Sequence, residues 1–321
     1  MAGVSVRLAE SAPNLLEQMT VAEAVRVFLT ARRGANLSRE TLAIDARVLR
    51  DLAKFLDNPQ LDQVTPDTLR KFLLLELNRT SPATGARYHT TLKAFCRFAF
   101  EEGLLTRNLM DTVRKPRFPQ PIIQPLTQEQ VEAMVNTCAD NTFVDTRDRL
   151  VLLALVDTGI RASELTALTL DDVDTTTQTF AIHNSKGNKP RTVPYGKAVA
   201  SALRTYLTRR GELDTDRLIV NSLGQPTTRY RIRLLVVKRA KQAGIEHPRL
   251  GPHLLRHTSA VSFLRNGGNP FVLQRLLGHS DLSMTRRYVQ LADSDLSDQH
   301  ARFSPADALN THATGGRRRL R

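Results

Sequence analysis

The first third of the chain places apolar residues at the spacing of amphipathic helices. Thr20 to Glu23 has the pattern of a capping box, and apolar residues then recur every three or four positions up to Gly34. Three further patterns of this kind cover residues 39–56, 66–77 and 82–103. The four helices and their short connections predict a small all-α domain over residues 19–113. Residues 1–18 lack such a pattern, and we expect them to form a flexible arm.

A proline-rich stretch separates this part of the chain from the rest. Residues 114–126 have no helical period, and their prolines favour a semi-extended linker. Thr127 and Gln130 then form the next capping-box pattern. We therefore expect a second domain over residues 127–310, followed by a basic tail over residues 311–321.

The second domain combines helical and strand patterns. Helices are predicted near residues 128–138, 146–157, 197–209, 228–243, 252–265 and 270–277. Residues 179–183 and 191–194 are typical of strands joined in a β-hairpin, and residues 218–220 predict a short strand. Two more short helices are predicted over 293–303 and 305–309. The fold class is therefore an α-helical domain followed by a mainly α, α+β domain with a small antiparallel sheet.

Composition restricts the kinds of partner. The chain has 46 Lys and Arg against 32 Asp and Glu, a formal charge of +14, which favours a polyanion such as nucleic acid. No apolar run is long enough for a membrane span, no signal-peptide pattern is present, and no basic amphipathic helix supports binding to a membrane surface. Cys96 and Cys138 are too few for a zinc site or a disulfide framework, which suggests a reducing cytosol.

Basic side chains cluster on several predicted elements. The segment 229–241 has the densest helical group, and it contains no acidic residue. Candidates for contacts with a nucleic-acid backbone are Arg87, Lys93, Arg97, Lys189, Arg191, Arg229, Arg231, Arg233, Lys238, Arg239 and Lys241. A solvated basic face is the alternative interpretation.

A turn near the C-terminal end carries the most distinctive chemistry. Gly278 ends a helix, His279 stands in the turn, and Tyr288 follows nine positions later. A tyrosine close to arginines can attack a phosphate. Upstream, His253 and Arg256 are three residues apart and therefore project from one helix face.

The other candidates have ordinary explanations when each is taken alone. Arg161 follows a buried helix and could form a salt bridge with Glu164, and Lys186 could be a surface lysine in a turn. The other tyrosines do not follow a Gly-His turn; they are Tyr88, Tyr195, Tyr206 and Tyr230. The order of the whole series is what makes it specific.

This series resembles that of the tyrosine site-specific recombinases, the phage-integrase family that includes the Xer-type chromosome resolvases. The close matches are the segments 157–161, 253–257 and 276–280, in the expected order. The likeness covers roughly residues 15–310, and the first domain resembles the SAM-like core-binding domain of the family. The resemblance implies that the second domain is the catalytic domain, with a fold shared by type IB topoisomerases.

The resemblance also implies the roles of the site residues. Tyr288 would attack a DNA phosphate to form a 3′-phosphotyrosyl intermediate, while Arg161 and Arg256 hold the non-bridging oxygens. Lys186 would be the general acid for the departing 5′-oxygen, with Lys189 as the competing candidate.

Four further residues complete the implied set. His253 would manage the proton of the tyrosine, and His279 would bind the phosphate or orient the nucleophile. Glu164 would hold Arg161 in place, and His257 would support the helix that carries His253 and Arg256.

The implied partners follow from this chemistry. They are double-stranded DNA with a specific core site and a homotetramer assembled on paired sites, which exchange strands through a Holliday junction. No metal, cofactor, membrane or small-molecule substrate is expected, since the arginines supply the positive charge. We expect a cytoplasmic, nucleoid-associated protein of a prokaryotic or mobile-element context.

Two alternatives remain open from the residues. A type IB topoisomerase-like enzyme would relax DNA with the same chemistry, and an architectural protein would bind DNA without cutting it. Val289 to Leu291 replaces a Thr-His pair that relatives often carry, which weakens only the assignment to the narrow Xer branch.

Overall fold

The computed structural model describes residues 19–35, 37–116, 123–139, 142–183 and 190–278, together with positions 285, 288, 289, 300 and 304–306. The chain divides into two compact units between residues 122 and 123, which we call unit 1 and unit 2. The predicted arm, the basic tail, most of residues 293–309, and the linker from 117 to 122 lie outside the described residues.

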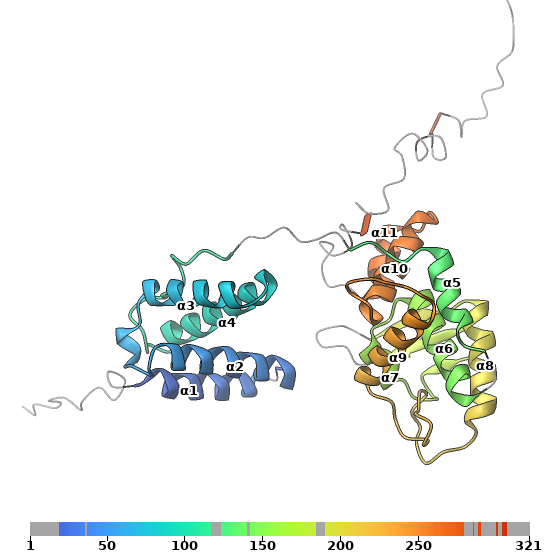
Figure 1. The fold of residues 1–321 in the computed structure, drawn as a ribbon, viewed down its shortest axis with the longest axis horizontal. Helices are drawn as coiled ribbons and strands as arrows, with labels where there is room; N and C mark the ends of the chain where they lie inside the picture. Colours follow the sequence, from blue (N-terminus) through green and yellow to red (C-terminus); the bar gives the residue numbers. More distant parts are fainter. Residues whose placement is uncertain are drawn as a thin grey trace, which may run out of the picture. The chain divides into compact units, whose positions relative to one another are not determined.

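Unit 1 is a bundle of helices (Figure 1). Its elements are α1 (Val21–Gly34), α2 (Arg39–Phe55), the 3-10 turn η1 (Leu61–Gln63), α3 (Pro66–Arg79) and α4 (Pro82–Glu101). A Ser or Thr side chain at the N-cap accepts a backbone hydrogen bond at the start of each α-helix of this unit, as Thr20 and Ser81 do for α1 and α4. Aromatic side chains fill the centre, where the rings of Phe28 and Phe95 lie 5.6 Å apart.

Unit 2 is built around α6, an apolar helix that packs against α8 and α10 (Figure 1). Its helices are α5 (Gln128–Asn136), α6 (Phe143–Thr158), α7 (Ala162–Ala167), α8 (Lys197–Arg210), α9 (Arg229–Gln242), α10 (Pro252–Arg265) and α11 (Pro270–Leu277). Residues 150–152, 154 and 155 of α6 are buried, which explains why this helix shows no polar face. Among the described residues, no helix combines the length and the apolar character needed to cross a membrane.

A small antiparallel sheet completes unit 2. It has the order β1-β2-β3, formed by β1 (Val173–Asp174), β2 (Thr179–Ile182) and β3 (Arg191–Pro194). Ile182 pairs with Arg191 at the end nearest residues 184–189, which lie outside the described residues. The predicted strand at 218–220 is wrong, because this segment makes a single isolated bridge, from Val220 to Pro226. The predicted fold class, helical unit followed by a mainly α unit with a small antiparallel sheet, is confirmed.

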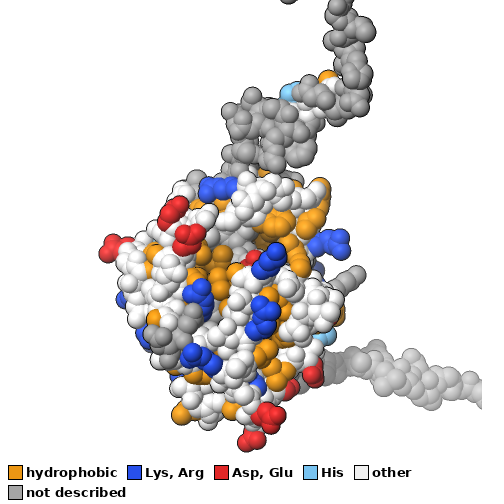
Figure 2. Space-filling view, turned by 90° about the vertical axis from the view of Figure 1, so that its right-hand side faces the viewer, with side chains coloured by type: hydrophobic (Ala, Val, Ile, Leu, Met, Phe, Trp, Pro, Cys, Tyr) orange, Lys and Arg blue, Asp and Glu red, His pale blue; other side chains and the backbone are white. Residues whose placement is uncertain are grey.

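Figure 2 shows one face of the molecule. Lys and Arg side chains are spread among apolar and polar side chains there, and most of the Asp and Glu side chains in view lie toward the edges. This distribution is suited to an extended anionic partner.

Candidate active site

The site is built where three helices of unit 2 meet, at the turn after α6. Gly159 ends α6 in the left-handed conformation, with φ of 61°. A Cβ atom at this position would lie 2.6 Å from Leu277 Cδ2 and 3.1 Å from Ser259 Oγ. Only glycine therefore allows the turn to approach α10 and α11 this closely. This approach places Arg161, the N-cap residue of α7, beside both helices.

Arg161 and Arg191 share one buried carboxylate. The backbone N–H of Arg161 donates to Glu164 Oε2 at 2.8 Å, and its Nη1 donates to Oε1 at 2.9 Å. Arg191 donates to both oxygens of the same carboxylate, at 3.0 and 2.8 Å. Burial alone would raise the pKa of Glu164, but the hydrogen bonds from the two arginines outweigh burial and lower it. Glu164 therefore stays ionised and holds both guanidinium groups.

Arg256 lies deeper and joins two helix ends. It is 6% exposed, and its guanidinium donates to Gly159 O at 2.6 Å and to Leu277 O at 2.8 Å. Burial, followed by the positive charge of Arg161, lowers the pKa of Arg256 to about 10. The side chain is still charged at neutral pH, and Arg161 adds a second positive charge to the site. These two positive charges favour the binding of an anion such as a phosphate.

His253 stands on α10 one turn before Arg256. The residue is exposed at the surface, yet part of its ring is desolvated, and this together with the charges of Arg256 and Arg161 lowers its pKa below the usual value. At neutral pH the ring is therefore uncharged, which is the form that accepts a proton.

Tyr288 lies at the same corner of unit 2. Its ring centroid is 5.4 Å from that of His257, and it packs on the small cluster of Ala260, Leu273 and Leu277. It also lies within electrostatic range of Arg256. His257 in turn donates from Nε2 to Ile123 O at 2.6 Å, so this histidine holds the start of unit 2 against α10.

The structure thus brings together six predicted site residues, which are Arg161, Glu164, His253, Arg256, His257 and Tyr288. Three further predicted residues lie outside the described residues: Lys186, Lys189 and His279. Gly159, Arg191 and Ser259 belong to the same corner, but sequence reasoning did not assign them to the site. A glycine at a helix end was the available signal for Gly159, whereas nothing in the local sequence distinguishes Arg191 from a surface arginine.

Two of the predicted nucleic-acid contacts need correction. Arg239 is 3% exposed and donates to Asp145, Asp148 and Thr137 O inside unit 2. Arg191 is likewise turned into the protein by Glu164 and Leu276 O. Both predictions were wrong because the sequence shows that a residue is basic but not whether an acidic side chain pairs with it in the folded protein. The remaining candidates on described residues are exposed: Arg87, Lys93, Arg97, Arg229, Arg231, Arg233, Lys238 and Lys241.

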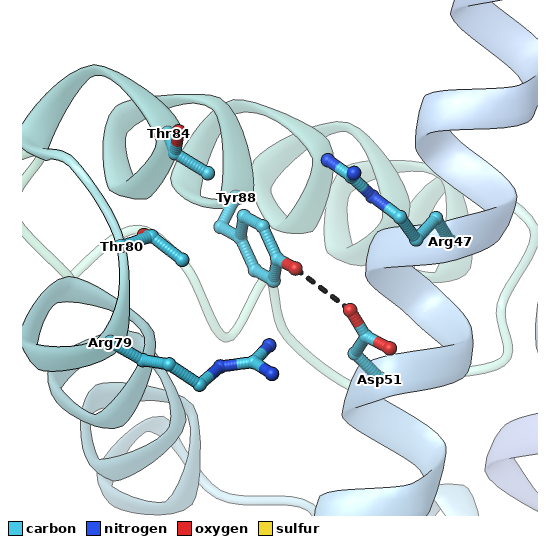
Figure 3. Close-up of a pocket in the computed structure, with 6 residues that line it drawn as sticks. All are labelled: Arg47, Asp51, Arg79, Thr80, Thr84 and Tyr88. Carbon is cyan, nitrogen blue, oxygen red and sulfur yellow. Dashed lines mark hydrogen bonds between the residues drawn. The ribbon is translucent and has the colours of Figure 1, made fainter.

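Unit 1 contains a separate pocket, whose lining includes Tyr88, Asp51, Arg47 and Arg79 (Figure 3). Tyr88 donates its hydroxyl to Asp51 at 2.7 Å, and burial followed by this hydrogen bond raises the pKa of Tyr88 to about 12. Arg79 is paired with Glu76 at 2.9 Å. The carboxylates balance the arginines here, and the tyrosine is kept protonated, so this pocket lacks the cationic excess of the site in unit 2.

Comparison with known proteins gives the family. Residues 124–295 match the phage integrase family. The chain is 33% identical over 281 residues to the tyrosine recombinase XerC of Listeria innocua serovar 6a, covering 84% of this chain and 93% of the relative. It is 30% identical over 290 residues to the tyrosine recombinase XerD of the same organism, covering 87% and 96%.

Solved structures share the fold. A Tn1549 transposon integrase in complex with transposon right end DNA has a TM-score of 0.76 at 21% identity, covering 90% of this chain and 100% of that one. XerH site-specific recombinase bound to palindromic difH has a TM-score of 0.70 at 20% identity, covering 89% and 85%. A lambda integrase dimer bound to a COC′ core site has a TM-score of 0.69 at 20% identity, covering 83% and 97%.

The family match and the Xer relatives define an enzyme that breaks and rejoins DNA strands. The chain belongs to the phage integrase family of site-specific tyrosine recombinases. The resemblance inferred from the motif series is therefore confirmed.

Proposed function

We propose that this recombinase cuts a specific DNA core site with Tyr288 and exchanges strands between two such sites. The observation that carries the proposal is the meeting of Tyr288 with Arg161, Arg256 and His253 at one corner of unit 2. DNA binding alone does not require a tyrosine beside two arginines and a histidine.

The cutting step is a phosphoryl transfer. The Tyr288 hydroxyl oxygen forms a bond to phosphorus, and the bond from phosphorus to the 5′-oxygen breaks. The neutral ring of His253 takes the tyrosine proton, and Lys186 gives a proton to the departing 5′-oxygen, which leaves as a hydroxyl. The 3′-phosphotyrosyl bond keeps the energy needed to rejoin another strand.

The arginines stabilise the transition state. A guanidinium has five N–H donors, and the contacts of Arg161 with Glu164 use only part of that set. Arg161 and Arg256 are held by the protein before the phosphate arrives, so little reorganisation is needed as negative charge grows on the phosphoryl oxygens. No metal is needed in this scheme, because fixed positive side chains take that role.

We further propose a homotetramer that acts on two double-stranded sites and exchanges strands through a Holliday junction. The solved structures of lambda integrase as a dimer on a core site and of XerH on palindromic difH support assembly on DNA, and two such dimers would make the tetramer. Residues 293–309 are the segment that would pack on a neighbouring subunit. Crosslinking on paired sites should give tetramers, and a result of monomers alone would contradict the assembly.

The test begins by selecting duplexes from a random DNA pool with the full chain and identifying their common core site. Wild-type protein should form a covalent complex with this DNA and recombine two copies of it. Tyr288→Phe should bind with similar affinity and lose covalent complex by at least about 10⁴-fold, since the nucleophile is gone. Tyr230→Phe is the matched control, because Tyr230 is an exposed tyrosine of the same unit.

The alternatives give different results in this experiment. Strand cleavage by Tyr288→Phe would refute the assignment of the nucleophile. Relaxation of supercoiled plasmids that lack the core site, without recombination, would identify a topoisomerase-like enzyme. Binding without any covalent complex by the wild-type protein would identify an architectural protein.

A further inference from the structure

We propose that Arg191 is a positioning residue that fixes both the phosphate-binding Arg161 and the end of the helix that leads to Tyr288. The inference rests on the proposed function, and it concerns a residue that makes no contact with DNA in this scheme. It gives the first residue of β3 a role in aligning the nucleophile with the phosphate.

The first support is the number and direction of the contacts of Arg191. Its two Nη atoms donate to the two oxygens of Glu164, and its Nε donates to Leu276 O at 2.9 Å. The side chain is 11% exposed and its carboxylate partner 1% exposed. The planar guanidinium of Arg191 thus connects β3 to α7 and to α11 through hydrogen bonds.

The second support is the sharing of Glu164. Arg161 uses the same carboxylate, but its side chain is 31% exposed and so extends toward the surface, where a phosphate can reach it. Arg191 occupies the inner side of the carboxylate. With both oxygens of Glu164 already fixed by Arg191, the direction of Arg161 is set before DNA binds.

The third support is the end of α11. The last carbonyls of a helix have no partner within the helix, and a cation stabilises them. Leu276 O accepts from Arg191, and Leu277 O accepts from Arg256. The chain passes from this point through Gly278 to Tyr288. Arg191 and Arg256 therefore set the position from which the tyrosine-bearing segment starts.

Arginine is specific for this role. One group must meet two carboxylate oxygens and, from a third nitrogen, a carbonyl oxygen of another element, and a planar fork does this. A lysine keeps the charge but supplies one nitrogen, so it cannot keep all three contacts. We therefore expect Arg191→Lys to lose alignment while it keeps the charge balance around Glu164.

The experiment compares cleavage of two DNA substrates with the selected core site. One is ordinary DNA, and the other carries sulfur in place of the bridging 5′-oxygen at the cleaved phosphate. The sulfur leaves as a thiolate and needs no proton from a general acid. Rates are measured as covalent complex formed per folded protein, with DNA affinity measured separately.

Arg191→Lys should form covalent complex about 100-fold more slowly on both substrates, with DNA affinity unchanged, because misalignment of the nucleophile is not cured by a better leaving group. Lys186→Ala should lose activity on ordinary DNA and recover it on the sulfur substrate. Arg239→Lys is the matched control, since it alters another buried, carboxylate-paired arginine of unit 2 away from the site, and its rate per folded protein should equal that of wild type.

Two results would overturn the positioning role. One is a rate for Arg191→Lys equal to that of Arg239→Lys, which would make Arg191 merely structural. The other is recovery of the cleavage rate of Arg191→Lys on the sulfur substrate. That result would mean that Arg191 acts only by positioning the general acid. Failure of the proposed function looks different, since then Tyr288→Phe would still cleave or the wild-type protein would form no covalent complex. Should Arg191→Lys fold poorly, Glu164→Gln tests the same connection, and it should slow both substrates to a similar extent.

Discussion

Gly159 meets two demands at once, and each can be measured. Its backbone has positive φ, and a Cβ atom added to it would lie 2.6 Å from Leu277 and 3.1 Å from Ser259. Gly159→Ala should destabilise unit 2 by about 2–5 kcal/mol, the sum of about 1–2 kcal/mol for the backbone and about 1–3 kcal/mol for overpacking. Denaturant unfolding of the two proteins gives this difference.

Gly244 provides the control for that substitution. It has a φ of 69° in the same unit, and a Cβ there would meet no atom within 4 Å. Gly244→Ala should therefore cost only the backbone part, about 1–2 kcal/mol. Equal losses for the two variants would show that the packing of α11 against the turn contributes nothing.

The residues of the site were predictable to different degrees for physical reasons. Arg161, His253, Arg256 and Tyr288 could be named because their order along the chain is specific. Arg191 could not, because its function depends on Leu276 O, which is 85 positions away and carries no signature of its own. A backbone carbonyl is present at every residue, and only the fold selects one of them.

At the scale of elements, the basic residues of α9 have two different roles, one inside unit 2 and one at its surface. Arg239 faces Asp145 and Asp148 inside unit 2, whereas Arg231 is exposed on the same helix. Arg239→Gln should destabilise unit 2 by about 3–5 kcal/mol, because Asp145 loses its cation and the buried Asp148 keeps only Arg147. Arg231→Gln should change stability by less than about 0.5 kcal/mol and should weaken DNA binding.

Urea unfolding and DNA titration of the two variants separate these roles. A small loss of stability for Arg239→Gln would mean that Asp145 and Asp148 find other partners. An unchanged DNA affinity for Arg231→Gln would remove this exposed part of α9 from the DNA-binding surface.

Most helix starts were well predicted because their signals are local, although α6 begins three residues earlier than predicted and the short α7 was not predicted. Ser or Thr at the N-cap and Pro at the first position act within one turn, as Thr65 with Pro66 does at α3. The segment at 218–220 failed for the opposite reason. Its apolar residues are buried, as in a strand, but a strand also needs a neighbouring chain at the right register, which local sequence does not specify.

At the scale of the whole molecule, each unit has a hydrophobic core of its own. In unit 1 this core includes Phe28, Leu49, Phe72 and Leu92, which belong to the four α-helices. A fragment of residues 19–116 should therefore fold alone, with a cooperative transition and a free energy of unfolding of about 5 kcal/mol or more. Circular dichroism during urea unfolding measures it.

A core variant controls for this result. Phe28→Ala should remove about 3–5 kcal/mol from the fragment, because Phe28 is 1% exposed and its ring packs on Phe95. A fragment that is helical but unfolds without cooperativity, and whose transition is unchanged by Phe28→Ala, would show that unit 1 needs the rest of the chain.

The anchoring of α11 by carbonyl oxygens has a consequence for how this protein can evolve. Leu276 and Leu277 are held by atoms that every amino acid possesses, so the anchor survives a change of side chain at Leu276. Mutational drift can therefore alter the exposed positions of this helix, Phe271 and Val272 among them, while the start of the tyrosine segment keeps its place. Purifying selection should fall on the two arginines instead, and a library that randomises only the exposed positions Phe271 and Val272 of α11 should retain many active recombinases.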